Sequence, residues 1–112
     1  MQNIPTPTTR TRTFKSYETG EQATERVTDW TIGGYTLRKT EEPGYLHWGV
    51  FTADRDLPAI FEVATYGAKT PEFGVNWSAC GTKPSADARA YAALLATAAD
   101  VADLFNRIVA DN

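Results

Sequence analysis

The sequence predicts an α+β fold: an antiparallel meander of four to five strands, packed on one face by a long C-terminal helix. Two observations support this prediction. Residues 26–80 contain short segments in which aromatic and β-branched side chains alternate with polar ones, separated by glycine and proline turns. Residues 86–109 then repeat apolar side chains every three or four positions, as the buried face of an amphipathic helix does.

Length and composition are those of one globular domain. The 112 residues are enough for a single core, and we place the domain at residues 14–112. Residues 1–13 are polar, with alternating threonine and arginine after two prolines, and we expect a flexible arm there. The formal net charge of −3 argues against general binding of nucleic acid, which needs concentrated positive charge.

Five segments of the domain are predicted to be strands, and the end of the arm offers a sixth at 13–18. The five segments are 26–32, 35–40, 45–52, 59–66 and 72–80. Gly33 and Gly34 predict a tight hairpin turn, because two-residue hairpin turns require positive φ. Residues 41–44, Glu-Glu-Pro-Gly, predict a four-residue turn in which proline presets φ and glycine takes the left-handed position.

The helix is predicted at about 86–109. Ser85 suits the N-cap, and Asp87 suits the positive end of the helix dipole. At ~1.5 Å per residue the helix reaches about 36 Å, whereas a strand of seven or eight residues covers only about 25 Å. We therefore expect the helix to lie diagonally across the sheet or to extend past its edge, where the arm or another subunit would cover it. Its apolar face consists of Tyr91, Leu94, Leu95, Ala98, Val101, Ala102, Phe105, Ile108 and Val109.

Side-chain alternation assigns the two faces of the sheet. Trp30, Trp48 and Trp77 share a side with aliphatic neighbours, which predicts that all three lie in the core against the helix. If the turn at 41–44 has four residues, Arg38 falls opposite His47 on the other, outer face. The residues expected on this outer face are Arg38, Tyr45, His47, Phe51, Ile60, Glu62, Tyr66 and Asn76.

The outer face is the candidate site, and the sequence leaves four interpretations open. The simplest is an ordinary solvated sheet face with cross-strand polar pairs. Aromatic side chains among Arg and Asn have the composition of protein-contact patches. Alternatively, the N-terminal arm folds over the face through Phe14 and Tyr17. An enzyme interpretation makes His47 a general base oriented by Glu62, with Arg38 binding an anion.

Other signatures are few. One cysteine and one histidine cannot supply four zinc ligands, and we expect neither a metal nor a cofactor. No segment has the ~18 consecutive apolar residues of a membrane span, and the first residues lack an apolar signal region. We therefore expect a cytoplasmic protein. In the arm, Arg10, Arg12 and Lys15 are candidates for contact with nucleic-acid phosphates.

The last third of the chain resembles small actinobacterial and actinobacteriophage proteins. The resemblance lies in GVNWSACG at 74–81, followed by SADARAYAALL at 85–95: a final strand and then an alanine-rich helix. It implies a small phage or prophage accessory protein that acts by binding, and it carries no functional residue over to this chain.

The leading hypothesis is a non-enzymatic protein-binding module, for example a phage-encoded modulator of a host protein. Its partner is another protein or a second copy of the chain, in a homodimer. Nucleic-acid binding through the basic arm is one alternative. A small-molecule or enzymatic site centred on His47, Glu62 and Arg38 is the other.

Overall fold

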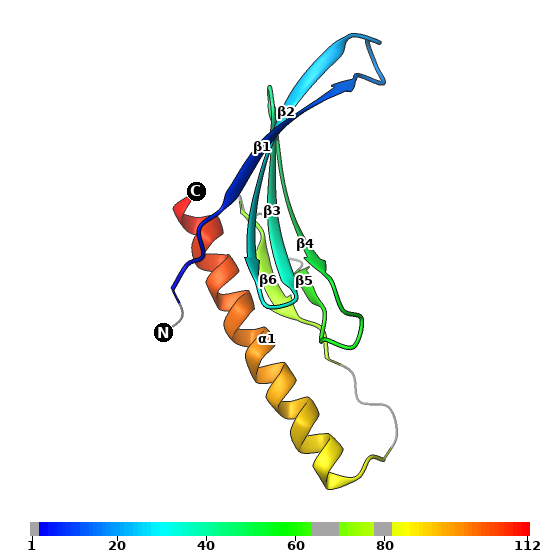
Figure 1. Ribbon diagram of the computed structural model, residues 1–112, viewed down its shortest axis with the longest axis vertical. Coiled ribbons are helices and arrows are strands. Elements are labelled where there is room, and N and C mark those ends of the chain that lie inside the picture. Colours follow the sequence, from blue (N-terminus) through cyan, green and yellow to red (C-terminus); the bar gives the residue numbers. More distant parts are fainter. Residues whose placement is uncertain (1–2, 64–69, 78–81) are drawn as a thin grey trace. The chain divides into compact units, whose positions relative to one another are not determined.

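The computed structural model describes residues 3–63, 70–77 and 82–112, and it confirms the α+β fold (Figure 1). The described chain forms a four-stranded antiparallel sheet, a separate two-stranded sheet and one long C-terminal helix. The sequence analysis placed one domain at 14–112. The structure divides into two compact units, Pro5–Phe51 and Thr52–Asn112, the latter joined by Met1–Ile4.

The first unit is a four-stranded antiparallel meander, built from three of the predicted strands and from β1, which was not one of the five strands predicted for the domain. Its strands follow one another in the spatial order β1-β2-β3-β4. Gly33, with a φ of 57°, begins the predicted two-residue turn between β2 and β3. The next turn is two residues shorter than predicted, because β3 continues through Glu42 and leaves only Pro43 and Gly44 to reverse the chain. The register that paired Arg38 with His47 is shifted as a result. The strands are β1 (Thr8–Lys15), β2 (Gln22–Ile32), β3 (Tyr35–Glu42) and β4 (Tyr45–Thr52).

Strand β1 corrects the prediction of a flexible arm for residues 8–13. Its threonines suit an extended strand, and its arginines find carboxylates on β2, so a segment with almost no apolar side chain still pairs along its whole length. The strand predicted at 13–18 ends at Lys15, and Gly20, with a φ of 72°, closes the turn that follows. Pairing of β2 with β3 starts only at Arg26, so the β1–β2 hairpin extends past β3 (Figure 1).

The inner side of the meander holds two of the three predicted core tryptophans. Trp30 and Trp48 are buried, and their rings stack with centroids 5.9 Å apart. Leu37, paired with Trp30 across β2 and β3, is fully buried. The Lys39 ammonium lies 5.5 Å from the centre of the Trp48 ring. Alternation therefore predicted the inner face of this sheet correctly.

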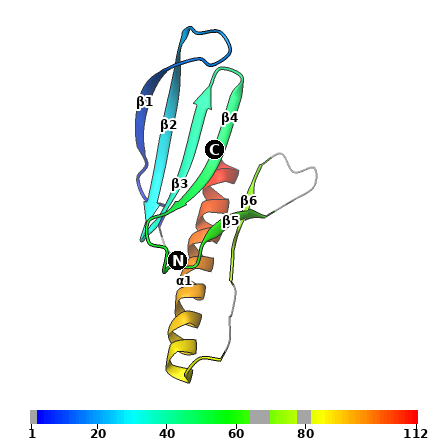
Figure 2. The same cartoon turned by 90° about the vertical axis from the view of Figure 1, so that its right-hand side faces the viewer.

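The second unit contains β5 (Ile60–Val63), β6 (Glu72–Val75) and α1 (Ser85–Asp111). Among the described residues these two strands pair with each other only, as a separate sheet, and α1 packs on β6 (Figure 2). Asn106 of α1 fixes this packing: its side-chain Oδ1 accepts the Phe73 N–H at 2.7 Å, and its Nδ2 donates to the Phe73 carbonyl at 3.0 Å. One amide side chain thus satisfies both backbone groups of a strand residue, as a neighbouring strand would.

The helix starts and packs differently from the prediction. Pro84 occupies the N-cap position without a side-chain hydrogen bond, and Ser85 is already helical. The predicted apolar face is buried only from Ala98 onward; Leu94 remains 38% exposed. We call residues 85–97 the N-terminal half of α1, and none of its residues is buried. The buried residues of the helix are Ala98, Val101, Ala102, Leu104, Phe105, Ile108 and Val109.

Two further face assignments in this unit are wrong. Ile60, expected on the outer face, is 2% exposed, whereas its neighbour Phe61 is 59% exposed. Ile60 pairs with Val75, on the side of β6 that also carries buried Phe73. Trp77, expected in the core, is 68% exposed, because β6 ends at Val75 and the alternation stops there.

The Asn106 bridge predicts a large effect of a small substitution. Asn106→Ala removes two hydrogen bonds and leaves both Phe73 backbone groups without protein partners, so we expect a loss of about 1–3 kcal/mol in the free energy of unfolding. Urea denaturation measures it. Thr97→Ala is the matched control on the same helix: it removes one exposed hydrogen bond to Ala93 and should change stability by less than about 0.5 kcal/mol. Equal effects would contradict the role of the bridge.

The unequal exposure of the tryptophans predicts the fluorescence of the protein. Trp77 is 68% exposed, whereas Trp30 and Trp48 are 4% and 8% exposed. Acrylamide should therefore quench mainly Trp77, and Trp77→Phe should remove most of the quenchable emission. Trp48→Phe is the control and should leave it in place. Quenching that survives in the Trp77→Phe variant would contradict the exposure described above.

Candidate functional site

Asp29 is the centre of the outer face of the four-stranded sheet. It lies directly opposite Arg38 in the β2–β3 register. Arg38 donates from Nε to Oδ1 at 2.9 Å and from Nη2 to Oδ2 at 3.1 Å, a bidentate pair. Arg10 of β1 donates to the same Oδ2 at 3.1 Å. One carboxylate on β2 therefore links β1 to β3.

The ionisation of Asp29 reflects these bonds. The hydrogen bond from Arg38 is the largest influence, and together with Arg10 it lowers the pKa of Asp29 against the opposing effect of burial. The same hydrogen bond raises the pKa of Arg38. The Asp29 side chain is only 14% exposed, so the group is held as a shielded, charged anchor.

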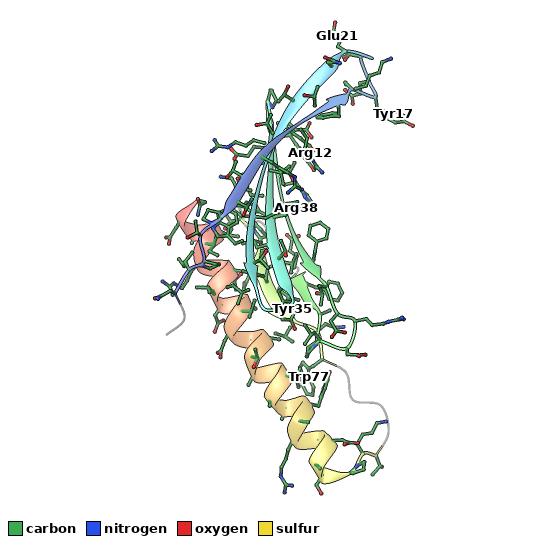
Figure 3. All side chains as sticks on the ribbon, viewed as in Figure 1. Arg12, Tyr17, Glu21, Tyr35, Arg38 and Trp77 are labelled. Atoms are coloured by element: carbon green, nitrogen blue, oxygen red, sulfur yellow. The ribbon has the colours of Figure 1, made fainter. Side chains whose placement is uncertain are left out.

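Arg38 connects this anchor to an aromatic ring on β4. Its guanidinium carbon lies 4.6 Å from the centre of the Phe51 ring, a cation–π distance. Because the bidentate pair with Asp29 fixes the plane of the guanidinium group, Phe51 has a fixed surface to lie on. Phe51 is still 51% exposed. The labelled Arg38 can be followed on the sheet in Figure 3.

Strand β4 continues the outer face as a row of rings. Tyr45 and His47 stack almost parallel, with centroids 6.4 Å apart and 5° between their planes. A Cβ atom at Gly49 would lie 3.5 Å from His47 Cε1 and 4.0 Å from Phe51 Cε2, so both rings lie close to the bare backbone of Gly49. Tyr45 is 56% exposed and His47 is also exposed. We call Tyr45, His47 and Phe51 the ring row.

Phe14 and Tyr17 do not cover the ring row as an N-terminal arm folded over the sheet would. Phe14 is part of β1, where it pairs with Ala23. Tyr17 is fully exposed in the turn at the tip of the β1–β2 hairpin, near Glu21 (Figure 3). Neither ring is therefore positioned by an arm that folds back.

The predicted nucleic-acid residues are strand residues with partners. Arg10 is paired with Asp29, and Arg12 forms an ion pair with Glu25, directly opposite it on β2. Lys15 ends the strand and is exposed. Arg10 and Arg12 thus each have a carboxylate partner on β2, although their side chains remain 42% and 46% exposed.

The remaining predicted site residues do not belong to this sheet. Glu62 and Asn76 are exposed and Ile60 is buried, and all three lie in the second unit, Ile60 and Glu62 on the separate two-stranded sheet. Tyr66 lies outside the described residues. The single outer face predicted from the sequence therefore ends at β4. The described side chains also bring no three metal-ligating groups together.

Two features of the structure, the Asp29 cluster and a groove at Trp77, were not predicted from the sequence. Asp29 directly precedes Trp30 in β2. Because side chains alternate along a strand, the sequence could have placed Asp29 on the outer face, opposite Arg38. Trp77 lines an open apolar groove of about 400 Å³ in the second unit, together with Val75, Leu95 and Ala99. That groove had no sequence signal, because it depends on where β6 ends.

Comparisons of the chain with protein-family models, with curated proteins and with solved structures show no significant match. No helix in the described part of the chain is long and apolar enough to cross a membrane. The site must therefore be interpreted from its own geometry.

The Asp29 cluster predicts a stability that depends on pH. The pKa of Asp29 is lower in the folded chain than in the unfolded one, so its stabilisation is complete above about pH 4 and is lost as the pH falls through the folded-state pKa. At pH 7 we expect Asp29→Asn to cost about 1–3 kcal/mol, and we expect this cost to shrink in acid.

Denaturation of wild type and variant between pH 2 and pH 7 measures this difference. Glu25→Gln removes the carboxylate that pairs with Arg12 alone and is the control, with an expected loss below about 1 kcal/mol. An Asp29→Asn cost that is the same at every pH would contradict the assignment.

Proposed function

We propose that this chain is a protein-binding module whose contact surface is the ring row on β4 together with Arg38. One observation supports the proposal most: Tyr45 and Phe51 stay more than half exposed, at 56% and 51%, in a row beside a fixed guanidinium group. Tyrosine, other aromatic residues and arginine are the side chains enriched among the dominant contacts of protein interfaces.

The surface is also organised before any partner arrives. Asp29 holds the plane of Arg38, Phe51 lies on that plane, and Tyr45 stacks on His47. Side chains that are already ordered lose less conformational entropy on binding, so more of the contact energy appears as affinity. A row of exposed rings suits another protein surface better than a small molecule, which needs a concave site.

Two kinds of partner are compatible with this surface. A phage-encoded modulator of a host protein is the version that the resemblance of residues 74–95 supports. A second copy of the chain is the other version, in which two ring rows meet in a homodimer. The ring row and Arg38 would form the contact surface with either partner.

Ring truncation tests the proposal. Immobilised wild-type chain is exposed to a lysate of the cells in which it naturally functions, and the captured protein is identified and its Kd measured. Tyr45→Ser and Phe51→Ser should each weaken binding by about tenfold or more, because each removes a central aromatic contact. Light scattering over a range of concentrations measures self-association with the same variants.

Leu46→Ser is the matched control. Leu46 is 51% exposed, as Phe51 is, and it neighbours Tyr45 in the strand, but alternation places it on the opposite face of β4. It should bind like wild type. The proposal fails if the ring variants bind like wild type, or if wild type captures nothing and remains monomeric at every concentration.

A further inference from the structure

The free edge of β1 is a second surface of the sheet, at the opposite side from β4. β1 is the first strand in the order β1-β2-β3-β4, and within the described part of the chain it pairs only with β2. Seven of its eight residues are exposed. Among the residues that the structure describes, no backbone or side-chain group donates to or accepts from the outward backbone groups of β1. The edge therefore offers an unused ladder of N–H and C=O groups.

The two faces of this edge have different chemistry. Thr8, Arg10, Arg12 and Phe14 share the side of Asp29 and Glu25, as the cross-strand pairs show. The alternate positions hold three threonines, which suit β-branched neighbours on an added strand, and Lys15 at the end of the strand. A strand that joins this edge would thus meet guanidinium groups on one face and methyl and hydroxyl groups on the other.

The guanidinium face carries more positive than negative charge. Asp29 is shared by Arg10 and Arg38, so this cluster holds two guanidinium groups for one carboxylate. The side chains of Arg10 and Arg12 remain 42% and 46% exposed. A carboxylate directly across from either arginine on an added strand is favourable, whereas another cation there is unfavourable.

This charge pattern selects against a second copy of the chain. Twofold antiparallel pairing of β1 with itself keeps the arginine face of both strands on one side. In the registers that pair nearly the whole strand, Arg10 then faces Arg12 of the other copy, or Arg12 faces itself. Like charges directly opposite destabilise such a pair. The occupant must differ in charge from β1 itself.

We propose that β1 receives an extended acidic peptide segment of a partner protein, which adds to the sheet as a fifth strand. The backbone ladder supplies affinity without regard to sequence, and Arg10 and Arg12 select glutamate or aspartate at alternate positions. Single-stranded nucleic acid would share the charge preference but not the backbone ladder. This surface is separate from the ring row, and the inference stands whether or not the ring row binds a protein.

The probe is an octapeptide of alternating valine and glutamate, capped at both ends and matching the eight residues of β1. Fluorescence anisotropy measures its binding to the whole chain. The corresponding valine–lysine peptide should not bind. Two further versions of the valine–glutamate peptide carry N-methyl groups on alternate residues: one on every valine and the other on every glutamate. We call these the two N-methyl phases. One phase removes the N–H groups that face β1 and should abolish binding; the other removes N–H groups that face solvent and should be tolerated.

Variants of the chain supply the second test. Arg10→Gln and Arg12→Gln should each raise the Kd of the valine–glutamate peptide by about two- to fivefold, which is the effect of losing one cross-strand charge pair. Lys15→Gln removes the same charge from the other face of β1 and should leave binding nearly unchanged. Circular dichroism confirms that each variant is folded, and the N-methyl comparison needs wild type alone.

Three results would overturn the proposal. The valine–glutamate peptide fails to bind, the two N-methyl phases bind equally, or an oligothymidine binds where the peptide does not. Equal binding of the two phases would show attraction of charge without strand addition. Oligothymidine binding alone would return Arg10 and Arg12 to the nucleic-acid hypothesis.

Discussion

The shared carboxylate of Asp29 is the constraint on which the outer face depends. A single anion, 14% exposed, accepts hydrogen bonds from arginines on the strands at either side of it. Through Arg10 it secures β1, which has almost no apolar contribution of its own. Through Arg38 it fixes the position of Phe51 on β4. Because the bidentate pair of Arg38 with Asp29 is charge-assisted and has a fixed geometry, the arrangement is directional as well as stabilising.

Local periodicity predicted the parts of the fold whose stability is local. The hairpin at Gly33, the inner positions of Trp30 and Trp48, and the long helix all follow from residues within one or two turns or strands of each other. β1 was assigned to an arm because its pattern of threonine and arginine has no apolar side. The carboxylate partner of Arg10 lies 19 residues away on β2, farther along the chain than local alternation can indicate.

The candidate site was predicted in part for the same reason. Alternation along β4 placed Tyr45, His47 and Phe51 on one face, and Arg38 joined them from β3. The extension of that face to Ile60 failed because β5 pairs with β6 in a sheet of its own. The Asn106 side chain joins that sheet to the helix by hydrogen bonds to Phe73, 33 residues away in the sequence. An asparagine within a helix does not by itself indicate that it bonds to a distant strand.

The helix, finally, is one continuous element with two sources of order. From Ala98 onward its side chains are buried, whereas residues 85–97 depend on the intrinsic helix preference of alanine, the commonest residue there. Isolated helices of that length are marginal in water. Backbone amide protons in this first stretch should therefore exchange with solvent far faster than those beyond Ala98, and the helix should unwind from its N-terminal end while the rest of the chain stays folded.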